Sequence, residues 1–415
     1  MSSRLRLGVQ QALFGWVNFA LTAPAIYLWL GLPLVMRQQG WSGTEIGLFQ
    51  LAGLPAVFKA LLAIPVERWP APVPSNSPSG LPSARSSGIH AWLRWAWLTG
   101  GGFALCLLAL AVAGDQAGKA TLFALALLAA LLSTWADIPV QALAIGLLPP
   151  QARPLAGGIR AAATFAGAVV GGGVMLLLQQ ARGWALPFLI LAAGVLSALI
   201  VVAVLGRRSG VQMSTVSKAP APALWPTWQG FFRQPGAPAW ALLLVGQFPF
   251  VAAAWVFLKP LLLDHGLQPG QVAVVAGVGG GALGACASIA AGLLRRERLK
   301  SAALWSSWAN ALALALLAVA LASGAGVAGV LVGSAALALA MGVASSLAFA
   351  LMMEFARDGH RAADYGLQAG LFSLSRVTVP PLAGVVLDRF GDAAMLGVLA
   401  AGALCTALAA RRCLR

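Results

Sequence analysis

The chain has 415 residues, of which 60% are hydrophobic and 9% charged, with 27 Lys or Arg and 11 Asp or Glu. Soluble globular proteins carry about 25% charged residues, so these few charges cannot cover a soluble surface for a chain of this length. Disorder is excluded as well, because disordered chains have low hydrophobicity. The composition therefore predicts a membrane protein, in which a net charge of +16 does not imply a nucleic-acid partner.

About twelve apolar runs are long enough to cross a bilayer as helices, which takes about 20 residues each. They are 9–31, 44–65, 92–113, 119–146, 155–180 and 184–205, then 239–262, 271–294, 301–323, 326–353, 364–387 and 392–410. A β-barrel is excluded because the runs are too long and do not alternate. The predicted fold class is all-α, a polytopic membrane protein with two six-helix bundles, 1–205 and 239–415. A cytoplasmic linker is expected at 206–238 and a Pro/Ser-rich loop at 70–88.

Positive charge falls mainly on one side of the predicted membrane. Most Lys and Arg residues between the spans lie in the linker, at the two termini and in every second loop. The exceptions on the other side are Arg37, Lys119, Arg182 and Arg389. Cytoplasmic loops carry an excess of Lys and Arg, so we expect both termini in the cytoplasm.

The two halves of the chain show weak internal similarity. Arg153, Gly158 and Gly183 match Arg361, Gly366 and Gly391 at one constant offset. A parallel repeat of six plus six helices is the organisation of the major facilitator fold, in which substrate binds between the halves. The glycine runs 171–173 and 279–281 predict close approach of helices, with bending points for alternating access as the other interpretation.

Asp137 is the only one of the 11 acids that lies deep in an apolar run. Gln141 is one helical turn further along, so both side chains can face one cavity. A buried carboxylate can take up a proton near neutral pH, which suits proton-coupled transport. The alternative is a structural ion pair with a neighbouring helix.

Other polar residues extend the predicted binding site for substrate and proton. Arg376 is the most central cation of the second half and could hold an anionic group or pair with a carboxylate. Asn18 and Gln247 occupy nearly equivalent repeat positions. Lys59 and Arg160 lie near span ends, where their side chains can snorkel to the surface.

The remaining candidates lie toward the outer side or in an aromatic wall. Lys259 could line the outer mouth, and Tyr27 and Trp255 could contact a flat ligand, with helix packing as the alternative for each aromatic. The cysteines form no paired motif and the histidines no cluster, so we expect no disulfide, metal site or cofactor. No nucleophile-base arrangement or phosphate loop is present, so we do not expect an enzyme.

Four segments resemble the AmpG-like branch of the major facilitator superfamily. They are LPLVMRQQGWSGTEIGLF (32–49), VFKALLAIPVERW (57–69), ADIPVQA (136–142) and ADYGLQAGLFSLSRV (363–377). In this branch the fourth helix carries a second acid where this chain has Gln141. The superfamily's Gly-x-Asp-Arg-x-Gly-Arg loop, which forms a cytoplasmic gate contact, is reduced here to Glu67-Arg68 and the Pro/Ser-rich stretch.

The compact length favours the siderophore permease group of that branch, RhtX/FptX, over the longer muropeptide permeases. The resemblance implies a proton symporter, a monomer in the bacterial inner membrane, that brings a ferri-siderophore or its ligand into the cytoplasm. A pyochelin-like ligand, an aromatic carboxylate or phenolate, would suit a cavity with aromatic and cationic side chains. A muropeptide permease and a drug exporter of the same fold remain the alternatives.

Overall fold

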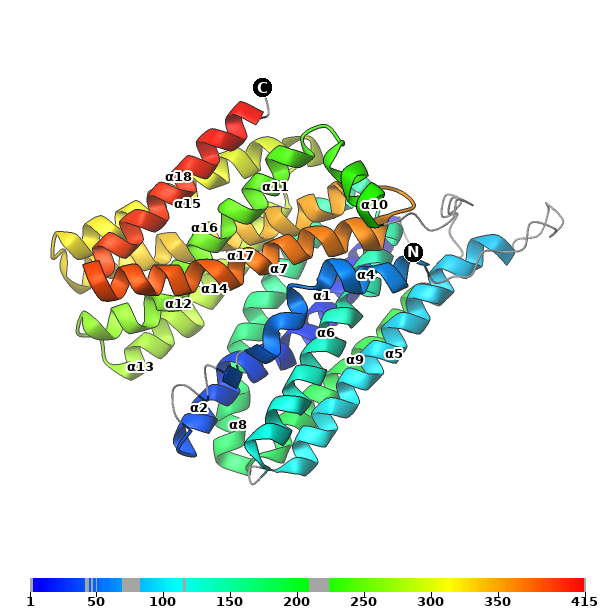
Figure 1. Ribbon diagram of the computed structural model, residues 1–415, viewed down its shortest axis with the longest axis horizontal. Helices are drawn as coiled ribbons and strands as arrows, with labels where there is room; N and C mark the ends of the chain where they lie inside the picture. The colour runs from blue at the N-terminus through cyan, green and yellow to red at the C-terminus, as the bar shows by residue number, and fades with distance from the viewer. Residues whose placement is uncertain are drawn as a thin grey trace. The chain divides into compact units, whose positions relative to one another are not determined.

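The computed structural model describes residues 3–41, 45, 48–49, 51–68, 83–114, 117–208 and 224–413. Every regular element in these ranges is helical, which confirms the predicted all-α class (Figure 1). The chain forms two compact units that do not coincide with its two halves. The first unit is Met1–Pro149, Val170–Phe231 and Phe355–Gly370, and the second is Pro150–Val169, Phe232–Glu354 and Leu371–Arg415. Each unit therefore includes a segment from the other half of the sequence.

In the first unit, α5 packs between α6 and α9, and α1 packs on α9 (Figure 1). Its helices are α1 (Ser3–Ile26), α2 (Leu32–Gln38), α4 (Lys59–Arg68), α5 (Ser83–Ala113), α6 (Lys119–Leu147), α8 (Met175–Arg182), α9 (Ala185–Arg208) and α10 (Leu224–Phe232). The π-helices η1 (Tyr27–Gly31) and η4 (Val170–Val174), the 3-10 helix η2 (Leu51–Ala56) and the start of α17 (Arg361–Phe390) complete it.

In the second unit, α7 and α16 pack on α14, and α15 packs between α16 and α18. Its α-helices are α7 (Arg153–Val169), α11 (Ala237–Gly246), α12 (Phe248–Asp264), α13 (Pro269–Val272), α14 (Gly280–Gly292), α15 (Leu299–Ala322), α16 (Gly326–Glu354), the rest of α17, and α18 (Asp392–Cys413). The shorter elements are the 3-10 helices η3 (Pro150–Ala152) and η6 (Arg296–Arg298) and the π-helix η5 (Ala273–Gly279).

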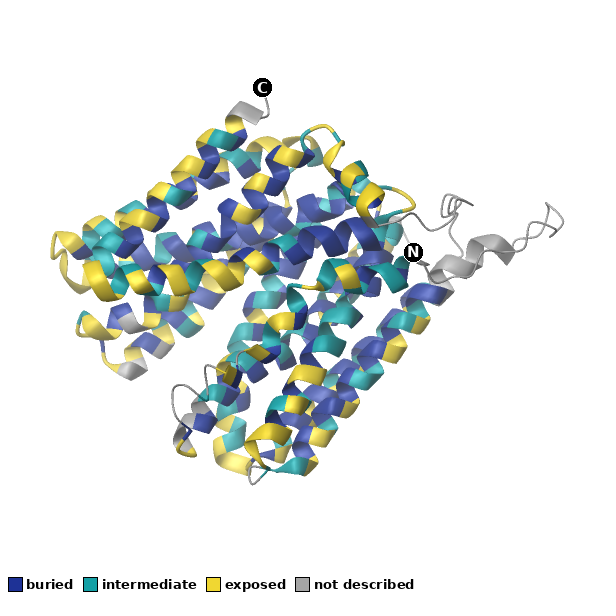
Figure 2. Ribbon diagram, in the orientation of Figure 1, coloured by how far each residue is buried: buried dark blue, intermediate teal, exposed yellow. Residues whose placement is uncertain are grey.

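Eleven helical segments in the described part of the chain are long and apolar enough to cross a membrane, and they match eleven of the expected spans. They are Leu5–Gly31, Ala91–Ala113, Lys119–Leu147, Pro150–Arg182, Ala185–Gly206, Ala237–Lys259, Val274–Gly292, Arg296–Ala322, Gly326–Glu354, Arg361–Phe390 and Asp392–Arg411. Their outer faces carry apolar side chains such as Leu98, which is 69% exposed, and Val112, which is 87% exposed (Figure 2). Such surfaces are stable against lipid and not against water.

The expected span 44–65 differs from a continuous helix. In its described part, η2 ends at Ala56 and α4 begins at Lys59 after a turn. Pro55 lies inside η2, and proline lacks the backbone N–H that a continuous helix needs. The break places Lys59 at the first turn of α4.

The expected linker and loop are only partly described. Residues 209–223 of the linker and 70–82 of the loop lie outside the described residues. In the described parts, α9 extends to Arg208, α10 occupies linker positions 224–232, and α5 begins at Ser83. Helix α10 was not expected from the sequence.

The glycine runs produce close helix contacts at some of their positions. A methyl group on Gly171 would collide with the carbonyl oxygen of Ala23 and lie 3.0 Å from the backbone nitrogen of Tyr27. One on Gly281 would lie 2.9 Å from the side chain of Val169, whereas one on Gly173 would meet nothing within 4 Å. Without a hydrophobic force between helices in lipid, such backbone approach provides much of their association.

Replacing Gly171 with alanine should destabilise the protein. The added methyl group overpacks a helix contact made by backbone atoms, which costs about 1–3 kcal/mol. We expect a melting temperature several degrees lower in detergent, measured by the thermal unfolding of purified protein. Gly173→Ala in the same π-helix is the control, and an equal melting temperature for the two variants would contradict the assignment.

Candidate functional site

Asp137 accepts three polar contacts inside the first unit. Its side chain is 17% exposed and forms an ion pair with Lys59, whose side chain is 11% exposed. The hydroxyl of Tyr365 donates to the same carboxylate oxygen at 2.5 Å, and the Nε2 of Gln141 donates to the other oxygen at 2.9 Å. The cluster joins α6 to α4 and to the start of α17.

Gln141 extends this cluster to α1. Its Nε2 also donates to Oδ1 of Asn18 at 2.8 Å, and Nδ2 of Asn18 donates to the carbonyl oxygen of Phe14 at 2.8 Å. Gln141 is fully buried and Asn18 is 7% exposed. The structure thus brings together three predicted site residues, Asp137, Gln141 and Asn18.

Lys59 and Tyr365 were missed as members of the site. The expectation that Lys59 snorkels to the surface is wrong, because its ammonium group binds Asp137 and lies 5.3 Å from the ring centre of Tyr365. Gly366 and Gly370 let α17 approach α4, since methyl groups there would lie 3.0 Å from the carbonyl oxygen of Lys59 and 3.1 Å from that of Val57. A lysine inside a predicted span was the available signal, whereas Tyr365 gave none.

The ion pair between Lys59 and Asp137 resolves an electrostatic cost. A single charge deep in the hydrocarbon region costs at least about 2.5–3.5 kcal/mol. The attraction between two opposite charges in contact, with extra hydrogen bonds from Tyr365 and Gln141, offsets part of that cost. Protonation of Asp137 would remove its charge and leave that of Lys59 uncompensated. The cluster is therefore suited to couple a proton to a structural change.

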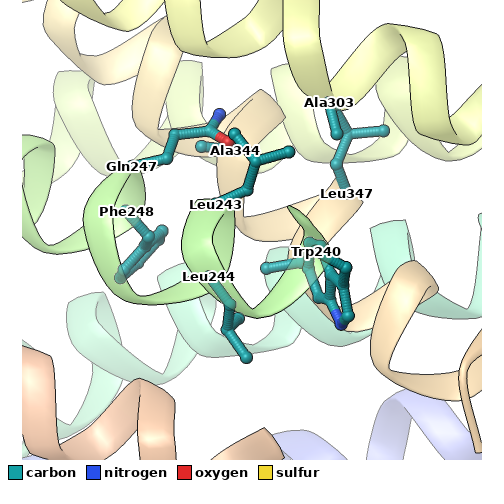
Figure 3. Close-up of a pocket in the computed structure, with 9 residues that line it drawn as sticks. Trp240, Leu243, Leu244, Gln247, Phe248, Ala303, Ala344 and Leu347 are labelled. Atoms are coloured by element: carbon teal, nitrogen blue, oxygen red, sulfur yellow. The ribbon is translucent and has the colours of Figure 1, made fainter. Parts of the chain in front are cut away.

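A second polar region lies in the second unit, where the helix of the seventh expected span is interrupted. Gln247 separates α11 from α12, and its Nε2 donates to Oγ of Ser306 at 2.8 Å. Gln247 and Phe248 line a small, mostly apolar pocket with Trp240 and Leu243 (Figure 3). The pocket has room for little more than water, so it is not by itself a site for a large solute.

The other predicted site residues occupy different environments. Arg376 is exposed in the second unit, near the rings of Phe248 and Phe372. Tyr27 is fully buried in the first unit, with its ring 5.2 Å from that of Phe188. Trp255 packs on the apolar core of the second unit, and Lys259 is exposed.

Glu67, at the end of α4, binds the start of α17. Its carboxylate accepts the backbone N–H groups of Ala362 at 2.8 Å and Ala363 at 3.0 Å, at the start of α17. Burial raises the pKa of Glu67 from 4.5 to about 7, although the two N–H groups act in the opposite direction. A comparable contact exists in the second unit, where Glu354 binds Arg296 at 2.5 Å and Arg153 at 3.6 Å.

No three His, Cys, Asp or Glu side chains gather into a metal-binding group in the described part of the chain. The site therefore consists of carboxylate, ammonium, phenol and amide groups on membrane-spanning helices. These groups can bind a solute or a proton.

A sequence model of the Major Facilitator Superfamily matches residues 12–380, and the chain belongs to this superfamily. The structure is similar to the human organic anion transporter MFSD10 (TETRAN), with a TM-score of 0.72 and 14% identity over 99% of this chain and 100% of that one. It is similar to the transporter FucP in the outward conformation, with a TM-score of 0.65 and 16% identity over 98% of each chain.

A third similar structure is a bacterial homologue of the iron transporter ferroportin, with a TM-score of 0.68 and 18% identity over 97% of each chain. At these identities the similarity shows the fold. With the family match, it makes the chain a multi-pass membrane protein and a secondary transporter of a small solute, not an enzyme.

Replacing Lys59 with methionine should destabilise the protein more than removing both charges of the pair. Breaking a buried ion pair costs about 3–5 kcal/mol, because it leaves one charge without its partner. We expect a clearly lower melting temperature for Lys59→Met and a partial recovery for the double variant Lys59→Met/Asp137→Leu. A double variant less stable than Lys59→Met would contradict the pairing.

The contact of Glu67 with α17 should depend on pH. The pKa of Glu67 is about 7 when its carboxylate binds α17 and 4.5 when it is in water. Glu67 therefore binds a proton more tightly in the contact than in the open state. The contact should strengthen as the pH falls from 7 to 4.5 and be weakest above pH 7. Hydrogen exchange at the amides of Ala362 and Ala363, corrected for intrinsic rates, measures this. Glu67→Gln should remove the dependence, and equal pH profiles for variant and unmodified protein would contradict it.

Proposed function

We propose that this transporter is a proton-coupled importer that brings a siderophore, as the ferric complex or the free ligand, into the bacterial cytoplasm. In this proposal it lies in the inner membrane as a monomer with both termini in the cytoplasm, as the distribution of Lys and Arg predicts. The halves 1–205 and 239–415 act as the two bundles on either side of the substrate, joined by the linker 206–238.

The cluster around Asp137 is the observation that carries the proposal. Its carboxylate is held by Lys59 and Tyr365 on two other helices, α4 and α17. A proton on Asp137 would cancel its charge and release both partners, and Lys59 would then require a new environment. Proton binding would thereby favour a different arrangement of these helices, and substrate that prefers that arrangement would move with the proton.

The siderophore assignment rests on the resemblance to the AmpG-like branch. Three of the four segments that carry the resemblance, 57–69, 136–142 and 363–377, contain Lys59, Asp137 and Tyr365 in that order. The side chains of these three residues meet in one cluster, which supports a shared role for these segments. The compact length supports the siderophore permeases within that branch.

The two alternatives make different predictions for transport assays. A muropeptide permease would take up disaccharide-peptides and would support β-lactamase induction. A drug exporter would move its solute outward. Uptake of radiolabelled iron with candidate siderophores, compared between a deletion strain and the complemented strain, distinguishes the importer from both.

Replacing Asp137 with asparagine should abolish accumulation driven by a pH gradient, because the amide cannot exchange a proton. The exchange of labelled for unlabelled substrate across proteoliposomes needs no net proton movement, so it should persist. The measurement is substrate uptake in proteoliposomes with and without an imposed pH gradient.

Thr164→Ala is a suitable control for this experiment, because it removes a polar side chain from α7, the next span in the sequence. The hydroxyl of Thr164 donates a hydrogen bond within its own helix, to the carbonyl oxygen of Arg160. It should accumulate substrate normally. Accumulation by Asp137→Asn at the level of the unmodified protein would refute the role in coupling.

A further inference from the structure

We infer that the second unit carries a binding site for an aromatic organic anion, formed by Arg376 and a row of phenylalanine rings. The inference deepens the proposed function, and rests on it, by assigning a substrate class to named residues. It starts from the position of Arg376 near the middle of α17, which makes the guanidinium one of the few charges inside a spanning helix. Such charges usually pair with an acid or serve a ligand.

The described acids are engaged elsewhere or lie at helix ends. Glu67 binds backbone amides. Other acids form ion pairs with basic side chains: Glu45–Lys119, Asp137–Lys59, Glu297–Arg295, Glu354 with Arg153 and Arg296, Asp358–Arg361, Asp364–Arg357 and Asp392–His265. Asp264 and Asp388 are exposed near the ends of α12 and α17. Among the described residues, no carboxylate lies within ion-pair distance of Arg376.

Arg376 is stabilised by aromatic rings instead. Its guanidinium carbon lies 5.7 Å from the ring centre of Phe372 and 6.0 Å from that of Phe248. The faces of the rings attract the cation without neutralising it, so the hydrogen-bonding edge of the guanidinium keeps its capacity for a carboxylate. The side chain of Arg376 is exposed in the structure, whereas Phe248 and Phe372 are buried.

The rings beside Arg376 continue as a row. Phe248 and Phe372 have ring centres 4.6 Å apart, and Phe372 lies 6.2 Å from Phe349. At the other end, the guanidinium of Arg160 lies 4.2 Å above the ring of Phe349. The row therefore has a cation at each end and draws on α7, the start of α12, α16 and α17.

The chemistry of the row matches an aryl carboxylate. A planar guanidinium binds a carboxylate with two parallel hydrogen bonds, and neighbouring rings favour offset or edge contacts with an aromatic ligand. The break between α11 and α12 supports the assignment independently, because interrupted helices mark solute sites in secondary transporters. Gln247, in this break, lines the small pocket together with Phe248 (Figure 3). Phe248 is also part of the row, so the pocket and the row share this ring.

Binding of benzoate to the purified full-length protein in detergent tests the site without any transport. Benzoate should bind more tightly than cyclohexanecarboxylate, which has the charge without the ring, and benzamide, which has the ring without the charge. Arg376→Gln should raise the dissociation constant for benzoate about tenfold or more, and Arg376→Lys by less. Phe372→Leu should weaken the binding of benzoate but not the binding of cyclohexanecarboxylate. Arg389→Gln, an exposed arginine at the end of the same helix, is the matched control and should bind normally.

The proposal is overturned if the unmodified protein does not bind benzoate, if Arg376→Gln binds it unchanged, or if the three ligands bind alike. Retained folding of each variant is checked by its melting temperature. The assay uses no proton gradient and no siderophore. Normal accumulation by Asp137→Asn would therefore refute proton coupling and leave this site standing, whereas loss of benzoate selectivity would refute the site and leave proton coupling standing.

Discussion

The cost of placing a charge inside a membrane determines which polar residues matter in this protein. Only 11 acids are available in 415 residues, and one of them, Asp137, lies deep in a spanning helix. The first unit meets the cost with an ion pair to Lys59, and the second unit meets it around Arg376 with aromatic faces. The two solutions would have different consequences, since protonation of Asp137 would break its ion pair, whereas Arg376, which has no carboxylate partner among the described residues, would be neutralised by a bound anion.

Two acids contribute to the contacts between helices α4 and α17, and a proton on one would act in the opposite direction to a proton on the other. Near the start of α4, Lys59 meets Tyr365 through Asp137, and near its end Glu67 meets the first amides of α17. Protonation of Asp137 removes a charge that holds the two helices together. Protonation of Glu67 relieves the cost of burying its carboxylate and strengthens the same helix contact. In the proposed mechanism, the state of this contact would therefore depend on which carboxylate holds the proton.

The sequence predicted the membrane class, about twelve spans of which eleven are matched by helices, and an acid deep in one of them, because these depend on composition and on single positions. It did not predict the break before Lys59, where Pro55 interrupts a run that is apolar enough to span. The partners of Asp137 were also not predictable, since a pattern along one helix does not identify the neighbouring helix. Gly366 and Gly370 bring Tyr365 close to α4, but in a chain with 48 glycines their role is visible only in three dimensions.

Both sites combine segments from the two halves of the sequence. The Asp137 cluster takes Tyr365 from the second half, and the aromatic row takes Arg160 from the first. Helix α17 supplies residues to both, with Tyr365 in the first unit and Arg376 three turns further along in the second. If Asp137 binds the proton and Arg376 the anion, as proposed, both ligands act on one continuous helix, and α17 is the physical element through which their binding would be coupled.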